Sequence, residues 1–151
     1  MDRGKTIQNQ IHFEAEFIIE EGKLEEYKKL IEEMSRVVEA TEPDTLDYQF
    51  YLNRDQTKYI AHETYTNSEA VLAHNNGVVS QTVLPKIFSV SKINRFEVYG
   101  NPSKELQKVL RGFNVLTYSP FTEIRGYSKP TNKSVKLFSL GSVCQRWKKW
   151  C

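Results

Sequence analysis

The chain has 151 residues, which suffices for one packed core but is short for two domains, and its apolar fraction of 39% is that of an ordinary globular protein. Residues 129–151 carry six Lys or Arg and no acid, whereas residues 1–128 carry 15 basic against 19 acidic groups. A mildly acidic body disfavours a nucleic-acid surface, and no apolar run is long enough to span a membrane. We therefore expect a cytoplasmic protein with no membrane or nucleic-acid partner.

The first predicted elements are a strand and a long helix, which follow a flexible lead-in at residues 1–9. Apolar residues alternate from Ile11 to Ile19, the period of a strand with one apolar face. Between residues 23 and 40 the apolar positions recur at three- and four-residue steps, which is typical of an amphipathic helix. Pro43 ends this helix, because the residue before a proline is disfavoured in helical conformation.

Two strands at residues 45–52 and 59–65 come next, and the five-residue polar turn at 53–57 predicts an antiparallel hairpin. Aromatic residues occur on both faces of these strands. Thr66 and Glu69 match the S/T-x-x-E capping box, which predicts a helix from Ser68. Gly77 suits the left-handed residue that ends such a helix.

The rest of the chain is less regular. Residues 78–89 are apolar enough for a second helical piece, with Pro85 either breaking it or lying in a first turn. A strand at 93–99 and a short helix at 103–111 follow. Residues 114–127 are predicted to lie extended across the body, and residues 129–151 to form a basic, disordered tail.

The element order strand, helix, strand, strand, helix, strand is that of a ferredoxin-like α+β sandwich, a split βαβ frame with an antiparallel sheet. The predicted domain covers residues 10–128, with a core at 10–100 and a helical and extended extension at 101–128. Helices cover one face of such a sheet. Because the other face also carries aromatic residues, we expect a homodimer that buries sheet against sheet.

The frame together with the segment HETYTNSEAVLAH resembles the antibiotic biosynthesis monooxygenase domain. Members of that family show a Glu, a following aromatic residue, a short polar cap and a helix with Ala-His near its end. Those positions are here Glu63, Tyr65, residues 66–68 and Ala73 with His74. The likeness covers about residues 10–100, and the segments GNPSKELQKVLRGF and SPFTEIRGYSK look like the C-terminal extension of one branch of the family.

The resemblance, in particular to quinol monooxygenase-like members, implies a dimeric α/β-barrel and a monooxygenase that acts on a small aromatic substrate and O2. It implies no flavin, haem or metal, so no cofactor is expected. A phenol that has lost its proton can pass an electron to oxygen directly, and the protein needs only a base and a few hydrogen-bond donors. The predicted site comprises His74, His62, Asn75 and Tyr65 as catalytic residues, with Tyr48, Phe50 and Arg95 as substrate-binding residues.

Each of these residues also has a structural interpretation. His74 is suited to cap a helix end, His62 to face the dimer contact, and Glu63 to form an ion pair with Arg95. Tyr48, Phe50 and Tyr65 are equally suited to a core. Several members of the family place a Trp at the pocket wall, whereas both Trp residues here lie in the tail. The alternative function is therefore a non-catalytic dimeric module of the same fold that binds a small ligand.

Overall fold

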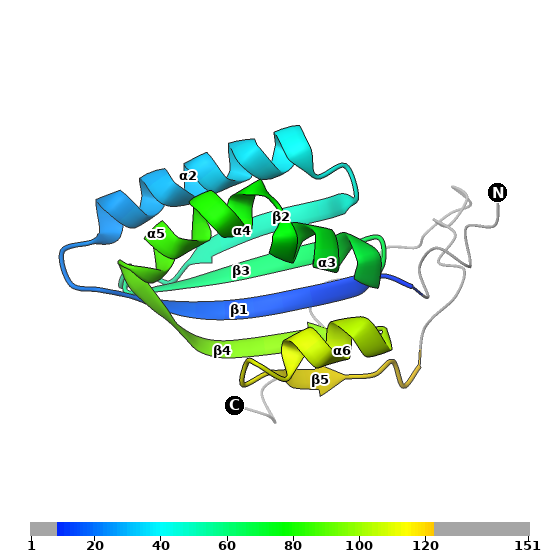
Figure 1. The fold of residues 1–151 in the computed structure, drawn as a ribbon. Coiled ribbons are helices and arrows are strands. Elements are labelled where there is room, and N and C mark those ends of the chain that lie inside the picture. The colour runs from blue at the N-terminus through cyan, green and yellow to red at the C-terminus, as the bar shows by residue number, and fades with distance from the viewer. Residues whose placement is uncertain (1–8, 123–151) are drawn as a thin grey trace, which may run out of the picture. The chain divides into compact units, whose positions relative to one another are not determined.

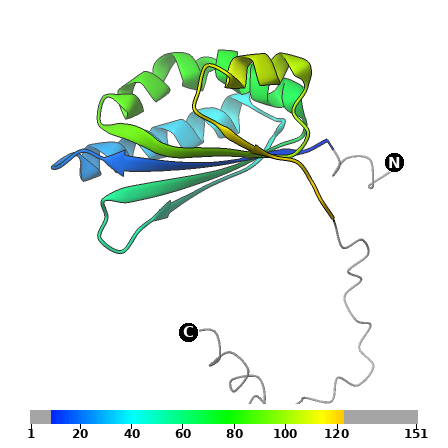
Figure 2. The same cartoon turned by 90° about the horizontal axis from the view of Figure 1, so that it is seen from below.

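The computed structural model describes residues 9–122, and within this range a five-stranded sheet carries five helices on one face (Figures 1 and 2). The strand order β2-β3-β1-β4-β5 is that of the predicted ferredoxin-like frame with one strand added at the β4 edge. The α+β prediction is confirmed, and the sheet of the single chain is not closed. The elements are β1 (Ile11–Ile19), α2 (Leu24–Thr41), β2 (Thr45–Leu52), β3 (Lys58–Tyr65), α3 (Ser68–Asn76), α4 (Val78–Thr82), α5 (Leu84–Phe88), β4 (Ser91–Tyr99), α6 (Lys104–Leu110) and β5 (Leu116–Tyr118).

The first strand and the first helix follow the sequence patterns. Alternate residues of β1, from Ile11 to Ile19, are buried against the helices, and α2 buries one stripe of its surface. Gly22, at φ 77°, makes the left-handed turn between them, a conformation that costs glycine little. The helix ends at Thr41, and Glu42 before Pro43 has the non-helical angles φ −126° and ψ 76°.

Strands β2 and β3 form the predicted antiparallel hairpin, in which Gln49 pairs with His62 and Phe50 with Ala61. Strand β3 pairs antiparallel with β1 along its other edge. Side chains alternate between the two faces of a strand. Ala61 and Tyr65 are therefore buried under the helices, whereas His62 is exposed on the opposite face.

Residues 78–89 form two one-turn helices, α4 and α5. Pro85 lies in the first turn of α5, where its missing N–H removes no intrahelical hydrogen bond. Of the two predicted positions for Pro85, a helix break or a first turn, the structure shows the first turn. Strand β4 begins at Ser91, two residues before the predicted start, and pairs antiparallel with β1 through a register shift.

The four predicted strands pair antiparallel, and a fifth strand that was not predicted is added at one edge. Strand β5 pairs parallel with β4, and α6 lies in the connection between them, as a parallel pair requires a crossover. The described part of residues 114–127 therefore extends the sheet instead of crossing the body. Residues 1–8 and 123–151, which include nearly all of the predicted lead-in and the predicted tail, lie outside the described residues.

The core lies between the sheet and the helices in two groups of buried side chains. The larger group packs α2, α4 and α5 onto the sheet, with the rings of Tyr27 and Tyr59 4.8 Å apart between centroids. The smaller group packs Val71 of α3 and Leu106 of α6 against Phe13. Within residues 9–122, no helix combines the length and the apolar character needed to cross a membrane.

Candidate active site

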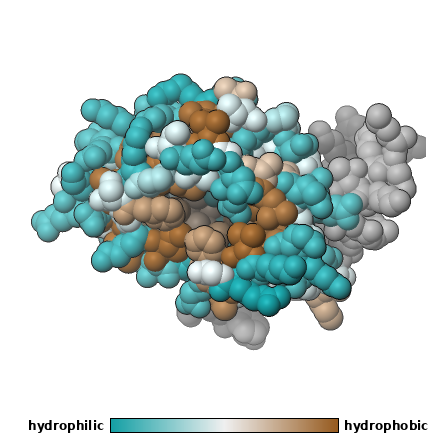
Figure 3. Space-filling model, viewed as in Figure 1, coloured by the Kyte–Doolittle hydropathy of each residue, from teal (hydrophilic) through white to brown (hydrophobic). Residues whose placement is uncertain are grey.

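A largely apolar cavity of about 120 Å³ lies between the sheet and the helices. An engineered protein cavity of about 150 Å³ accepts benzene, so this volume corresponds to about one aromatic ring. Figure 3 shows apolar side chains gathered across the middle of the helix-covered face of the molecule. Five of the residues that line the cavity carry polar side-chain groups, namely Tyr27, Tyr48, Glu63, His74 and Asn75.

Helix α3, which supplies His74 and Asn75, starts at Ser68 as predicted but with a different cap. The Asn67 side chain accepts a hydrogen bond from the backbone N–H of Ala70 at 2.9 Å, so Asn67 is the N-cap in place of Thr66. Asparagine is among the best N-cap residues, and here it is one position closer to the helix than the predicted capping box.

The end of α3 turns the chain sharply beside His74. Gly77 is extended, at φ −81° and ψ −176°, and the predicted left-handed conformation is wrong. A Cβ at Gly77 would lie only 3.0 Å from the carbonyl oxygen of Ala73, so this close approach favours glycine. The turn leaves His74 in the last turn of the helix with 5% of its surface exposed.

The imidazole of His74 is held by a carboxylate and two aromatic rings. Its Nδ1 lies 2.8 Å from Oε2 of Glu42, an oxygen that also accepts a hydrogen bond from the Thr45 hydroxyl at 2.9 Å. The rings of Tyr48 and Tyr65 pack edge-on, with centroids 6.1 Å and 5.6 Å from that of His74. Helix α3, the end of α2 and two strands thus fix one side chain in one orientation.

The surroundings of His74 and Glu42 favour the charged form of each side chain. Burial alone would lower the pKa of His74, but the hydrogen bond to Glu42 and the charge of Glu63 outweigh it, so the pKa is raised above the ordinary 6.5. Burial alone would raise the pKa of Glu42, but hydrogen bonds from His74 and Thr45 hold it below 4.5. Both directions describe an imidazolium beside a carboxylate below the raised pKa of His74, and a neutral imidazole that can accept a proton above it.

Glu63 brings a second carboxylate to the cavity wall. The Tyr65 hydroxyl donates a hydrogen bond to Oε2 of Glu63 at 2.7 Å, while the Tyr48 hydroxyl lies 3.6 Å from Sδ of Met34. Burial, followed by the charge of Glu63, raises the pKa of both Tyr48 and Tyr65 well above 10. Both phenols therefore remain protonated, and both can act only as hydrogen-bond donors or neutral acceptors.

Of the predicted substrate-binding residues, Tyr48 and Phe50 line the cavity, with ring centroids 4.8 Å apart. Asn75 also lines it and lies at its rim, because an outer groove of about 320 Å³ shares Asn75, Phe88 and Phe113 with the cavity. Tyr65 does not line the cavity, and its ring packs against the imidazole of His74. Four of the seven predicted site residues thus meet at one cavity.

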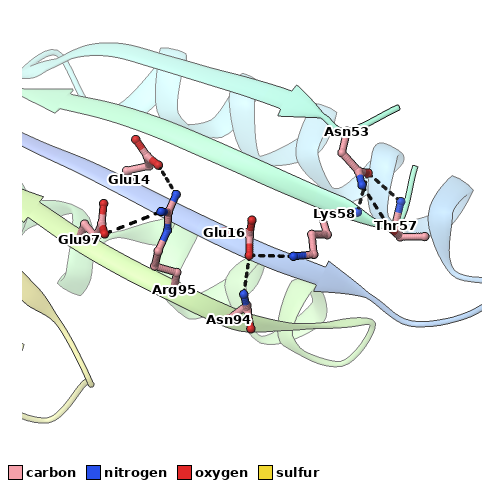
Figure 4. Close-up of polar contacts among 8 residues, drawn as sticks. All are labelled: Glu14, Glu16, Asn53, Thr57, Lys58, Asn94, Arg95 and Glu97. Carbon is pink, nitrogen blue, oxygen red and sulfur yellow. Dashed lines mark hydrogen bonds and ion pairs between the residues drawn. The ribbon is translucent and has the colours of Figure 1, made fainter. Parts of the chain in front are cut away.

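His62 and Arg95 lie on the opposite face of the sheet. Figure 4 shows Arg95 between Glu14 and Glu97, with its Nη2 donating to Oε1 of Glu14 at 2.6 Å. Nε2 of His62 is 3.2 Å from the other oxygen of Glu14. The structure of the single chain therefore does not bring these two residues to the cavity. The predicted ion pair between Glu63 and Arg95 is wrong, because the two residues point to different faces.

This outer face is more charged than the sequence alternation suggested. Glu16 on the central strand contacts Lys58 at 3.3 Å and also accepts a hydrogen bond from Asn94 (Figure 4). Aromatic residues remain on β2 and β4, where Tyr51 and Tyr99 are 49% and 36% exposed. The expected aromatic face is thus interrupted by ion pairs across β1, β3 and β4.

The sequence reasoning missed Glu42, Phe96 and Phe113 and treated Glu63 only as a structural residue. Glu63 shares its strand parity with Ala61, so the period of two could have placed it toward the helices. No local sequence pattern identifies Glu42, Phe96 or Phe113 as a site residue, because each reaches the site through tertiary packing.

Comparison with known proteins supports the same fold. Residues 11–83 match the family model described as antibiotic biosynthesis monooxygenase, and no curated protein sequence matches the chain significantly. The structure of MupZ from Pseudomonas fluorescens is similar with a TM-score of 0.64 and 23% identity, over 83% of this chain and 99% of that one. SnoaB from Streptomyces nogalater, a cofactor-independent oxygenase, is similar with a TM-score of 0.55 and 12% identity, over 64% of this chain and 96% of that one.

At these identities the two solved structures establish a shared fold, and the family model adds a relationship in sequence. The matched residues span β1 through α4 and contain both His74 and Glu42. Residues 11–83 therefore form a domain of the antibiotic biosynthesis monooxygenase family.

Proposed function

We propose that this protein is a cofactor-independent monooxygenase that oxidises a quinol-like or phenolic small molecule with O2. The observation that carries the proposal is a buried histidine, His74, on the wall of an apolar cavity about the size of one aromatic ring. The family match supports a monooxygenase, and the similar fold of SnoaB, a cofactor-independent oxygenase, supports chemistry without a cofactor.

The proposed reaction begins with proton transfer from the phenol to His74, while Tyr48 and Asn75 donate hydrogen bonds to the developing oxyanion. The phenolate then transfers one electron to O2, and the two radicals combine to form a new C–O bond. Loss of water leaves one oxygen atom in the product as a quinone carbonyl. The substrate itself supplies all of the electrons, and the protein supplies a base, orientation and an apolar enclosure.

The test is oxygen consumption by chelator-treated protein with a panel of one-ring and fused-ring quinols. We expect consumption by the wild type and a loss of about 100-fold or more in His74→Gln, the range that general base catalysis contributes. His62→Gln is the matched control, since His62 lies on the outer face. No consumption with any quinol, or equal rates for wild type and His74→Gln, would refute the proposal.

A non-catalytic ligand-binding module is the second candidate. It is favoured by the position of both Trp residues, Trp147 and Trp150, outside the family domain, whereas the resemblance leads us to expect a Trp at the pocket. Calorimetric binding of a quinol without oxygen consumption would support this module, and it would contradict the monooxygenase.

The proposal includes a homodimer formed through the outer sheet face and a cytoplasmic location. The exposed rings of Tyr51 and Tyr99 on that face favour burial, and the ion pairs between them would set the register of a partner. Light scattering at micromolar concentration should report a dimer, and Tyr51→Glu should weaken it. A monomeric wild type would contradict this assembly.

A further inference from the structure

His74 separates two hollow spaces. On one side is the apolar cavity, and on the other is a pocket of about 180 Å³ between the end of α2, the start of β2 and α3. Glu42, Thr45 and Gly77 line this second pocket together with His74. The imidazole therefore has a carboxylate on its pocket side and the predicted substrate space on its other side.

Glu42 is itself held in place. Its backbone N–H donates to the carbonyl oxygen of Val38 at 2.9 Å, and its Oε2 accepts hydrogen bonds from Thr45 and from Nδ1 of His74. The side chains of Glu42 and His74 are 10% and 6% exposed, so water competes weakly for this contact. A carboxylate can only accept, so the proton of a neutral His74 belongs on Nδ1.

From this geometry we infer that Glu42 is a positioning residue, which holds His74 as its Nδ1–H tautomer and thereby directs the basic Nε2 lone pair into the cavity. Among residues 9–122, Nε2 makes no hydrogen bond. Only the kinetic part of this inference rests on the function proposed above, since the tautomer and the proton affinity of His74 belong to the protein alone.

In the step concerned, a phenolic O–H bond breaks and its proton goes to Nε2, with the electron pair left on the phenolate oxygen. The imidazolium that forms keeps its Nδ1–H bond to Glu42, whose carboxylate stays ionised and offsets the new charge. Thr45 contributes by holding the same carboxylate oxygen. Glu42 thus makes His74 a stronger base without touching the substrate.

Other charged and titratable groups also face His74, and their effects on its protonation must be distinguished from the effect of Glu42. Glu63 of β3 also raises the proton affinity of His74, Tyr48 and Tyr65 contribute neutral rings, and Asp44 lines the second pocket. Within the described part of the chain, Glu42 alone makes a hydrogen bond to the ring, so we assign the choice of tautomer to Glu42.

The experiment is ¹⁵N NMR of histidine-labelled full-length protein, with the His74 signal assigned by His74→Gln. In the wild type we expect a neutral tautomer protonated at Nδ1 and a pKa above 6.5. Glu42→Gln should lower this pKa by about one unit or more, and Glu42→Asp, which keeps the charge, should give an intermediate value. The matched control is Glu39→Gln, an exposed residue of the same helix.

A second readout uses 4-nitrophenol, a one-ring phenol whose ionised form absorbs visible light. Wild-type protein should bind it and promote its ionisation, and Glu42→Gln should reduce the ionised fraction of the bound probe while Glu39→Gln should not. If quinols are oxidised, the acidic limb of the kcat/KM profile should shift with the pKa of His74.

A wild-type His74 that is protonated at Nε2 would overturn the inference without the need for any variant. An unchanged pKa in Glu42→Gln would also overturn it. Absence of oxygen consumption would refute only the proposed function, because the NMR and nitrophenol readouts do not depend on turnover.

Discussion

Replacing Glu42 by Gln should destabilise the fold by an amount that depends on pH. The Glu42 to His74 contact is 2.8 Å long between side chains that are 10% and 6% exposed, so solvent screening is weak. Hydrogen bonds to charged groups contribute about 1.5–3 kcal/mol, and we expect a cost in this range where both groups are ionised. Glutamine keeps the shape and an acceptor oxygen, so little of the cost comes from packing.

The sign of the pH dependence follows from the two shifts. The pKa of His74 is raised, so its contribution is complete below 6.5 and is lost as pH rises through the folded-state value. The pKa of Glu42 is lowered, so its contribution is present above 4.5 and is lost as pH falls through the folded-state value. The destabilisation should therefore be largest between pH 4.5 and 6.5.

Urea denaturation of wild type, Glu42→Gln, His74→Gln and the double mutant, repeated across pH, measures this coupling. The control is Glu33→Gln, which removes an ion pair with Lys86 that is 40% and 54% exposed and should cost less than about 1 kcal/mol at every pH. A coupling energy that does not change from pH 5.5 to pH 9 would refute the assignment of a charged buried pair.

Three further predictions concern the cavity and its frame. Ala61→Leu, at a buried position on the cavity wall, should abolish calorimetric binding of a one-ring phenol at a stability cost of about 1–3 kcal/mol, and undiminished binding would place the ligand elsewhere. Leu106→Ala should cost about 2–5 kcal/mol in urea denaturation because Leu106 is 0% exposed, and a cost below about 1 kcal/mol would mean that α6 is not integral to the core. Asn67→Ala should cost about 1 kcal/mol through loss of the helix cap, whereas an equal cost for Glu69→Ala would favour the capping box instead.

Local sequence patterns predicted most of the frame. The alternation in β1 and the apolar stripe of α2 are properties of neighbouring residues, and both are observed. Strand β5 was not predicted because three residues, Leu116 to Tyr118, make too short a pattern, and its parallel pairing depends on the crossover through α6.

The site was predicted less completely, for two different reasons. Parity within β3 already separates His62 from Ala61 and Tyr65, so the sequence itself argues against a single site that contains both His62 and Tyr65. Glu42 is different, because it lies 32 positions before His74 in the sequence and its own neighbourhood is an ordinary helix end before a proline. Such a contact depends on tertiary packing, and one sequence carries no local pattern for it.

The charges around the cavity also restrict what it can bind. Two carboxylates, Glu42 and Glu63, act on one imidazole, and no Lys or Arg is among the described residues that line the cavity. Arg95, a cationic residue predicted to bind the substrate, is paired with Glu14 on the other face. Bringing an anion into this space would be costly, since two negative groups face it and, above the pKa of His74, no described residue of the lining carries a positive charge. The substrate should therefore enter as a neutral phenol and lose its proton inside, so that binding weakens as pH rises through the pKa of the free phenol.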